Sequence, residues 1–235
     1  MKTKINLARM PVYLAIFLFF SFLATNLCFA QEPLETILYD VKPLGIGTCE
    51  YQDFGPTEFH GQKANLTIFK TDVAGFKDKE VILSEAGTYL PILVKRDISI
   101  WLHDEKITEE YSPRQNSFRL TKFEGGKKVE EYSVKGKSPI QNAILVPFSL
   151  RQARELKIGS TFDVVLPGEY TVKLTSIEEV SVPAGKFKAY HFTSEPEKFE
   201  IWISADNLRI PVKIKGLGGI PYTLEMKKRS TSKQR

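Results

Sequence analysis

Residues 178–215, EEVSVPAGKFKAYHFTSEPEKFEIWISADNLRIPVKIK, contain the pattern that decides the fold of this chain. Apolar and polar side chains alternate along them, most regularly from Phe199 to Ser204. Turn residues interrupt the alternation at 183–185, Pro-Ala-Gly, and at 205–207, Ala-Asp-Asn. Period-two alternation between such turns is typical of strands that bury one face. The stretch therefore predicts two β-hairpins in series.

The same alternation runs through most of the chain and indicates an all-β protein. It predicts further strands at residues 37–41, 48–54, 66–69, 81–83, 92–103, 107–111, 117–123, 129–134, 161–166, 170–179 and 222–226. The Gly55-Pro56 and His60-Gly61 pairs are expected to mark a loop after the second of these. Because about a dozen antiparallel strands must curl or split to hide their edges, we expect a mainly antiparallel, strongly curved sheet or a partly closed barrel.

One segment departs from the β pattern. Residues 139–156, PIQNAILVPFSLRQAREL, have apolar residues at helical spacing and good helix formers toward Leu156. Pro147 either limits an earlier helix to one turn or occupies the first turn of a second helix. We expect one or two short helices packed on the sheet through Leu145, Phe148 and Leu150.

The first thirty residues have the features of a signal peptide. Three basic residues lie within the first nine positions, and the run from Val12 to Leu23 is apolar. Small residues then lead to a predicted cleavage site between Ala30 and Gln31. This predicts a periplasmic or secreted protein. The alternative is an uncleaved N-terminal membrane anchor, although a span needs about 20 apolar residues and this run is shorter.

Beyond the signal peptide we expect a single β-rich domain over residues 31–226 and a basic, disordered tail over 227–235. The net charge of +5 falls to about +2 without the three bases of the signal peptide, and the five bases of the tail leave the domain near −3. This balance gives no indication of nucleic-acid binding. The tail could contact acidic lipid headgroups, so any membrane contact is expected to be peripheral.

Cysteine use predicts no disulfide in the exported chain. Cys49 is the only cysteine after residue 30, and its neighbours include no cation that would lower the pKa of its thiol. We expect a buried, unreactive thiol.

Three stretches resemble one exported bacterial family, catalogued as domain of unknown function 3108. They are LYDVKPLGIG at 38–47, QNAILVPFSLR at 141–151, and VPAGKFK, IWIS and LRIPV between Val182 and Val212. The resemblance implies an all-β domain that faces the periplasm, and it implies no established activity or catalytic residues. Members of the family often have an acidic residue early in the middle stretch, where this chain has Asn142.

The sequence indicates no catalytic, metal or cofactor site. His60, His103 and His191 are the only histidines, and their spacing is not that of metal ligands. The neighbouring acids at 130–131 and 178–179 point to opposite faces of their strands, so neither pair can act as a carboxylate dyad. We expect a protein that is not an enzyme and has no cofactor. An enzyme remains an alternative, and it would need polar residues that meet only in the tertiary structure.

Four aromatic residues are candidates for lining an apolar cavity: Phe148, Trp202, Trp101 and Tyr190. Aromatic residues in strands are more often plain core residues. With a cavity, the chain would be a non-enzymatic binding or envelope-maintenance module for an apolar ligand such as a lipid. Without one, it would be an interaction or scaffold module that docks an envelope protein.

Overall fold

The computed structural model describes residues 32–43, 47–101, 103–217 and 222–232. Residues 33–235 form one compact unit, separate from residues 1–32, and the fold described below is that of the former. The predicted signal peptide and its cleavage site, Ala30-Gln31, lie outside the described residues. Among the described residues, no helix has the length and apolar character that crossing a bilayer requires.

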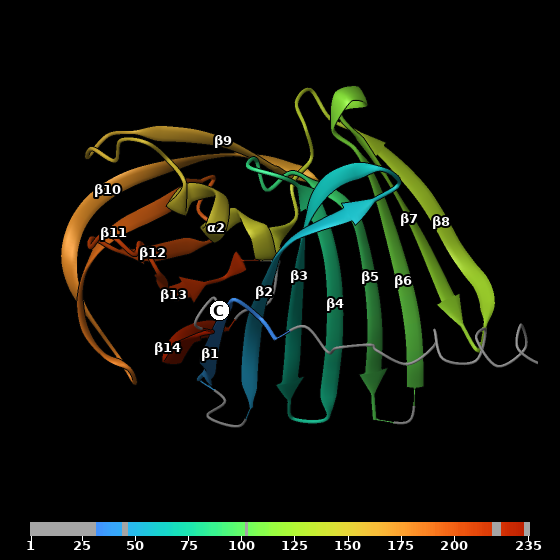
Figure 1. The fold of residues 1–235 in the computed structure, drawn as a ribbon, viewed down its shortest axis with the longest axis horizontal. Helices are drawn as coiled ribbons and strands as arrows, with labels where there is room; N and C mark the ends of the chain where they lie inside the picture. The colour runs from blue at the N-terminus through green and yellow to red at the C-terminus, as the bar shows by residue number, and fades with distance from the viewer. Residues whose placement is uncertain (1–31, 44–46, 102, 218–221, 233–235) are drawn as a thin grey trace, which may run out of the picture. The chain divides into compact units, whose positions relative to one another are not determined.

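Fourteen described strands form one antiparallel sheet (Figure 1). They are β1 (Glu35–Lys42), β2 (Thr48–Phe59), β3 (Gln62–Val73), β4 (Phe76–Glu85), β5 (Pro91–Ile100), β6 (His103–Ser112), β7 (Ser117–Glu124), β8 (Lys127–Lys135), β9 (Thr161–Leu166), β10 (Gly168–Val182), β11 (Gly185–Glu195), β12 (Glu200–Ser204), β13 (Pro211–Lys215) and β14 (Thr223–Thr231). A 3-10 turn, η1 (Pro113–Gln115), joins β6 to β7.

The first strand, β1, lies in the middle of this sheet, and the later strands extend it on both sides. Strands β1 to β8 each pair with the next, and β8 forms one edge. The chain then crosses to the other edge, β9, and β9 to β14 return until β14 pairs with β1. The sheet is curved but not closed, since β8 and β9 do not pair with each other. The predicted fold class is confirmed.

The segment between β8 and β9, residues 136–160, contains two short helical pieces, and we call it the crossing segment. It carries a 3-10 turn, η2 (Ala143–Leu145), followed directly by α2 (Val146–Arg151). Figure 1 shows β9 to β14 curving around α2. We call the sheet face that packs on this segment the inner face and the opposite one the outer face. The predicted packing residues Leu145, Phe148 and Leu150 are all buried.

The hairpins predicted from residues 178–215 are confirmed. Strands β10 and β11 join at the Pro183-Ala184 turn, and β12 pairs with both β11 and β13. Ile201 and Ile203 are fully buried on the inner face. They add to one large cluster of buried side chains that extends from β1 through β14 to α2.

The predicted loop is wrong at Gly55-Pro56, because β2 continues to Phe59, and it is right at His60-Gly61, where the chain turns into β3. Pairing with β3 shifts register between Asp53 and Gly55, which is the mark of a β-bulge. Gly55 has a φ of 73°, and its amide donates to Asp53 Oδ1 at 2.7 Å. Glycine adopts this left-handed conformation without a steric penalty, so the bulge needs no break in the strand.

The prediction of a strand over 92–103 is wrong at its C-terminal end. Strand β5 ends at Ile100, which lies opposite His103 of β6, and Trp101 takes a φ of 56° at the turn between them. The prediction of a helix running to Leu156 also fails at its end, since α2 stops at Arg151. Arg209 donates to the backbone carbonyls of Ala153 and Arg154, and this holds them outside a helical turn.

The predicted disordered tail is also corrected by the structure. Residues 227–231 form the second half of β14 and pair with β1. Basic residues of this stretch meet acids of β1, with Lys227 Nζ 3.0 Å from Asp40 and Arg229 Nε 2.6 Å from Glu35. Opposite charges on the two strands stabilise the ordered pairing of residues 227–231. Their basic composition by itself suggested disorder.

Candidate functional site

The four aromatic residues proposed as cavity lining do not come together. Phe148 alone lines the pocket described below. Trp101 is 81 % exposed at the β5–β6 turn. Trp202 is buried but lies on the outer face, where it stacks on His191. Tyr190 is half-buried beside Ile203 and does not reach the pocket.

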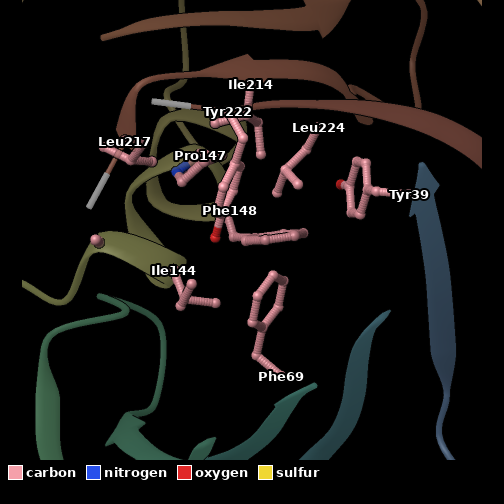
Figure 2. A pocket seen from close by; sticks show the side chains of 10 residues that line it. Tyr39, Phe69, Ile144, Pro147, Phe148, Ile214, Leu217, Tyr222 and Leu224 are labelled. Atoms are coloured by element: carbon pink, nitrogen blue, oxygen red, sulfur yellow. The ribbon is translucent and has the colours of Figure 1, made fainter. Parts of the chain in front are cut away.

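A small apolar pocket lies between the crossing segment and the inner face of the sheet (Figure 2). Its volume is about 30 Å³. The crossing segment, strands β1, β3, β13 and β14, and the connection between β13 and β14 contribute its walls, namely Tyr39, Phe69, Ala143, Ile144, Pro147, Phe148, Ile214, Leu217, Tyr222 and Leu224. The half-buried Leu217 and Tyr222 form its more accessible side. The pocket has room for about one or two water molecules.

A wider hollow of about 490 Å³ lies at the ends of the β5–β6 and β7–β8 hairpins. Charged residues line much of it, and some of them pair across it, as Lys106 does with Asp97 at 3.5 Å. Its openness to solvent and its paired charges make it a weaker candidate than the apolar pocket for holding an apolar ligand.

Beside the apolar pocket, the inner face carries three buried acids and one arginine. We call this set the acidic cluster: Asp78 and Glu80 of β4, Arg96 of β5, and Glu109 of β6. Arg96 Nε donates to Asp78 Oδ2 at 3.1 Å, and its Nη2 contacts the same oxygen. The distance from Arg96 Nε to Glu80 Oε1 is 3.8 Å. Tyr111 donates a hydrogen bond of 2.6 Å to Glu109.

Burial controls the protonation of this cluster. It raises the pKa of Glu80 to about 7, although Arg96 and a hydrogen bond from Asn142 act in the opposite direction. Burial also raises the pKa of Asp78 and that of Glu109 above their ordinary values. One guanidinium cannot compensate three buried carboxylates, so the cluster holds protons that exposed acids would release.

The far end of the crossing segment is fixed by a second buried ionic group. Arg151, the last residue of α2, contacts Glu35 of β1 with Nη1 at 2.6 Å, and Arg229 of β14 contacts the same carboxylate. Burial alone would raise the pKa of Glu35, but hydrogen bonds and charge from the two arginines outweigh it and hold this pKa below its usual value. Arg151 therefore ties the end of α2 to β1 in the middle of the sheet, and Arg229 joins β14 to the same carboxylate.

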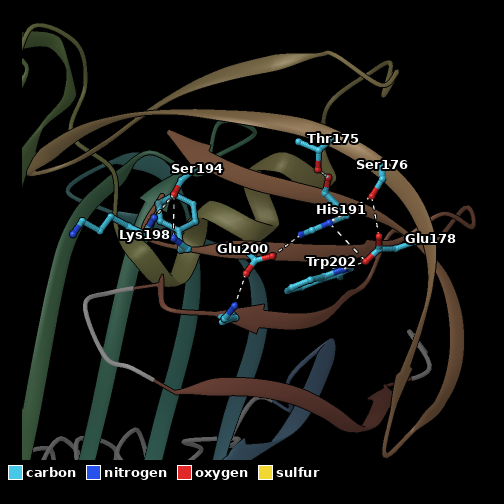
Figure 3. Close-up of polar contacts among 10 residues, drawn as sticks. Thr175, Ser176, Glu178, His191, Ser194, Lys198, Glu200 and Trp202 are labelled. Atoms are coloured by element: carbon cyan, nitrogen blue, oxygen red, sulfur yellow. Dashed lines mark hydrogen bonds and ion pairs between the residues drawn. The ribbon is translucent and has the colours of Figure 1, made fainter. Parts of the chain in front are cut away.

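The outer face of β10 to β13 carries a polar cluster that the sequence did not reveal (Figure 3). His191 stacks on Trp202 with ring centroids 4.3 Å apart, and its Nε2 lies 2.8 Å from Glu200 Oε2. Trp202 Nε1 donates to Glu178 at 2.8 Å, and Lys215 donates to Glu200 at 2.6 Å. These residues come from four neighbouring strands and join them across the sheet.

The same cluster places a hydroxyl, an imidazole and a carboxylate in sequence, as a hydrolase would need. Ser176 Oγ lies 3.5 Å from His191 Nδ1, but it donates to Glu178 at 3.0 Å. The hydroxyl is thus engaged by a carboxylate rather than by the imidazole. The arrangement fits cross-strand stabilisation better than nucleophilic catalysis.

Neither Cys49 nor the potential metal ligands form a reactive site in the described residues. Cys49 is buried, its Sγ lies 3.6 Å from Thr71 Oγ1, and burial raises the pKa of its thiol to about 11. This agrees with the predicted unreactive thiol. In the described part of the chain, no group of three His, Cys, Asp or Glu side chains is arranged to hold a metal ion.

Sequence reasoning missed the acidic cluster as well as the polar cluster of the outer face. Asp78, Glu80 and Ile82 are every second residue of β4, so their side chains point to the same inner face. This spacing can be seen in the sequence. Acids are rarely buried without a partner, so such a pattern is ordinarily assigned to a solvated face. In the folded sheet all three acids are buried, and Asn142 of the crossing segment hydrogen-bonds Glu80.

Comparison with known protein families places most of the chain in one family. Residues 57–226 match a family model described as protein of unknown function (DUF3108). The match includes two of the three resembling stretches, 141–151 and 182–212, and begins after the first. No curated protein matches the chain.

Proposed function

The chain belongs to the DUF3108 family of proteins of unknown function, and from this premise we propose that it is a non-enzymatic binding module for an apolar chain, such as a lipid acyl chain. The observation that supports the proposal is the apolar pocket between the crossing segment and the inner face of the sheet. Nearly all its lining side chains are aliphatic or aromatic. Burial of an acyl chain there would be favoured by about 25 cal/mol per Å² of apolar surface.

The pocket volume of about 30 Å³ requires that it enlarge when a ligand enters. Pockets that hold small-molecule ligands measure about 300–1,000 Å³. Enlargement is local in this proposal: Leu217 and Tyr222 are half-buried, and Phe148 lies between them and the sheet (Figure 2). The contacts of Arg151 with Glu35 keep the end of α2 in place while these side chains move.

Export is part of the proposal. The basic start, the apolar run and Ala30 support cleavage before Gln31, which would place the domain among envelope lipids. Intact mass and N-terminal sequencing of the protein isolated from its own cells test this. A chain that begins at Gln31 supports export, whereas the mass of all 235 residues would mean that the segment is retained.

Binding is tested with the neutral rod-shaped probe diphenylhexatriene, whose fluorescence rises in apolar surroundings. We expect saturable binding at micromolar concentration. Leu217→Asp should weaken it about tenfold or more, because it places a charge where the chain enters. Native mass spectrometry of the protein from its own cells should also detect an adduct of lipid mass.

Leu208→Asp is the matched control, since Leu208 is 49 % exposed and lies outside the pocket. It should bind the probe as the unchanged protein does. Equal loss of binding in both variants, or no saturable binding by the unchanged protein, would remove the apolar-ligand proposal.

A second candidate function is docking of an envelope protein by strand addition at β8. This strand is an edge of the sheet, and all its residues except Val134 are exposed. An exposed edge strand presents free backbone groups to another chain. A photoreactive residue at Val129 should then cross-link to a specific partner in cells, and one at Ile158, which is also exposed, should not.

A further inference from the structure

The acidic cluster borders the apolar pocket directly. Phe69, which lines the pocket, is the neighbour of Glu80 in the β3–β4 ladder, and Glu80 is in turn opposite Arg96. All three side chains lie on the inner face. Glu80 therefore lies one strand away from the wall of the pocket.

Two further contacts place the cluster at this end of the pocket. Asn142, which hydrogen-bonds Glu80, directly precedes the pocket residues Ala143 and Ile144. Tyr222 lines the pocket and extends past Phe148, with its hydroxyl at the end toward Ile144 (Figure 2). The charges of Glu80 and Asp78 are close enough to help raise the pKa of this tyrosine, after burial and Cys49.

One oxygen of the cluster lacks a partner. Asp78 Oδ1 is buried and has no hydrogen-bond partner among the residues that the structure describes, while Oδ2 of the same carboxylate takes both contacts from Arg96. The side chain of Asp78 is 3 % exposed. A buried carboxylate oxygen without a donor is costly, and a ligand that brings a donor would remove this cost.

From these positions we propose that the ligand is an amphiphile with a cationic group, such as a primary ammonium, which binds at Asp78 and Glu80 while its apolar chain lies in the pocket. This rests on the proposed function and specifies the ligand. An ammonium supplies three donors and one positive charge. It would pair with the free oxygen of Asp78 and reduce the charge imbalance of three acids against Arg96.

The alternatives have the wrong chemistry for this end of the pocket. A fatty acid would place its carboxylate beside Asp78, Glu80 and Glu109, and the like charges would repel. A long-chain alcohol could donate one hydrogen bond but would leave the imbalance of charge unchanged. The cluster should therefore rank the three head groups as ammonium, then hydroxyl, then carboxylate.

The test is displacement of diphenylhexatriene from the full protein by three chains of equal length, namely dodecylammonium, dodecanol and dodecanoate, at neutral pH and below their micellar concentrations. Dodecylammonium should displace the probe at about tenfold lower concentration than dodecanol, as expected for one charged hydrogen bond. Glu80→Gln and Asp78→Asn should each reduce this preference and leave displacement by dodecanol unchanged.

Glu110→Gln is the control, because Glu110 is next to Glu109 in sequence but is exposed and pairs with Arg119. It should keep the full preference for the ammonium. Equal displacement by the three compounds, or a preference for dodecanoate, would overturn this inference and leave the binding of apolar chains standing. Failure of the probe to bind at all would overturn the proposed function and this inference together.

Discussion

Phe148 of α2 stacks on Tyr51 of β2, with ring centroids 3.6 Å apart and planes inclined by only 9°. Tyr51 is fully buried and Phe148 is 2 % exposed. The contact joins the crossing segment to the half of the sheet formed by β1 to β8. It closes the inner face and forms one wall of the pocket in which we place the ligand.

Phe148→Ala should lower the free energy of unfolding by about 3–5 kcal/mol, because it removes a buried ring and leaves a cavity over Tyr51. Urea denaturation followed by circular dichroism measures the change. Ile158→Ala is the control, since Ile158 is 63 % exposed, and we expect it to be nearly neutral. Similar losses in both variants would contradict the position of Phe148.

Arg151→Ala should loosen the crossing segment more than the sheet. It leaves the buried carboxylate of Glu35 with Arg229 as its remaining ion-pair partner, and breaking a buried pair costs about 3–5 kcal/mol. Hydrogen exchange should accelerate first in residues 143–156. Lys157→Ala, which removes an exposed pair with Glu155, should change neither stability nor exchange. Uniform acceleration through all strands would argue against a local anchor.

Glu80→Gln should change how stability depends on pH. Burial raises the pKa of Glu80 from 4.5 to about 7, so the folded protein binds this proton more tightly than the unfolded chain does. Stability from this group is therefore fully present below pH 4.5 and is lost as the pH rises to about 7. The charged groups that act on it are Arg96, Asp78 and Glu109.

Because glutamine has no proton to lose, the variant should gain stability relative to the unchanged protein as the pH rises through this window. Urea unfolding at several pH values gives the difference between the two proteins. The variant Glu110→Gln should run parallel to the unchanged protein. A constant difference between Glu80→Gln and the unchanged protein would show that Glu80 titrates alike in the folded and unfolded states.

Substitutions at neighbouring residues of β12 should destabilise the protein to very different degrees. Ile201→Asp should prevent folding, because it buries a charge without a partner. Glu200→Gln should cost about 1 kcal/mol, since it weakens contacts with His191 and Lys215 on the outer face. Expression level and thermal unfolding distinguish these outcomes. Equal effects would mean that the strand does not alternate as the structure has it.

The sequence by itself determined the local structure. Period-two alternation and turn residues located the strands of residues 178–215, and Pro147 with the helix formers around it located η2 and α2. These features depend on neighbours along the chain, so they can be read without the fold. The errors at Gly55 and Trp101 are local too, because a bulge uses the glycine typical of a loop, whereas the apolar Trp101 at a tight turn continues the pattern of a strand.

Only the tertiary structure decided which side chains meet. The pairing of β14 with β1 ordered residues 227–231 beside the acids of β1, 187 positions away in the case of Lys227 and Asp40. The crossing of the chain between the two sheet edges placed Asn142 against Glu80, and the tertiary fold buried Asp78, Glu80 and Glu109. Burial and charge balance depend on contacts between distant segments, and alternation along one strand carries no information about what covers it.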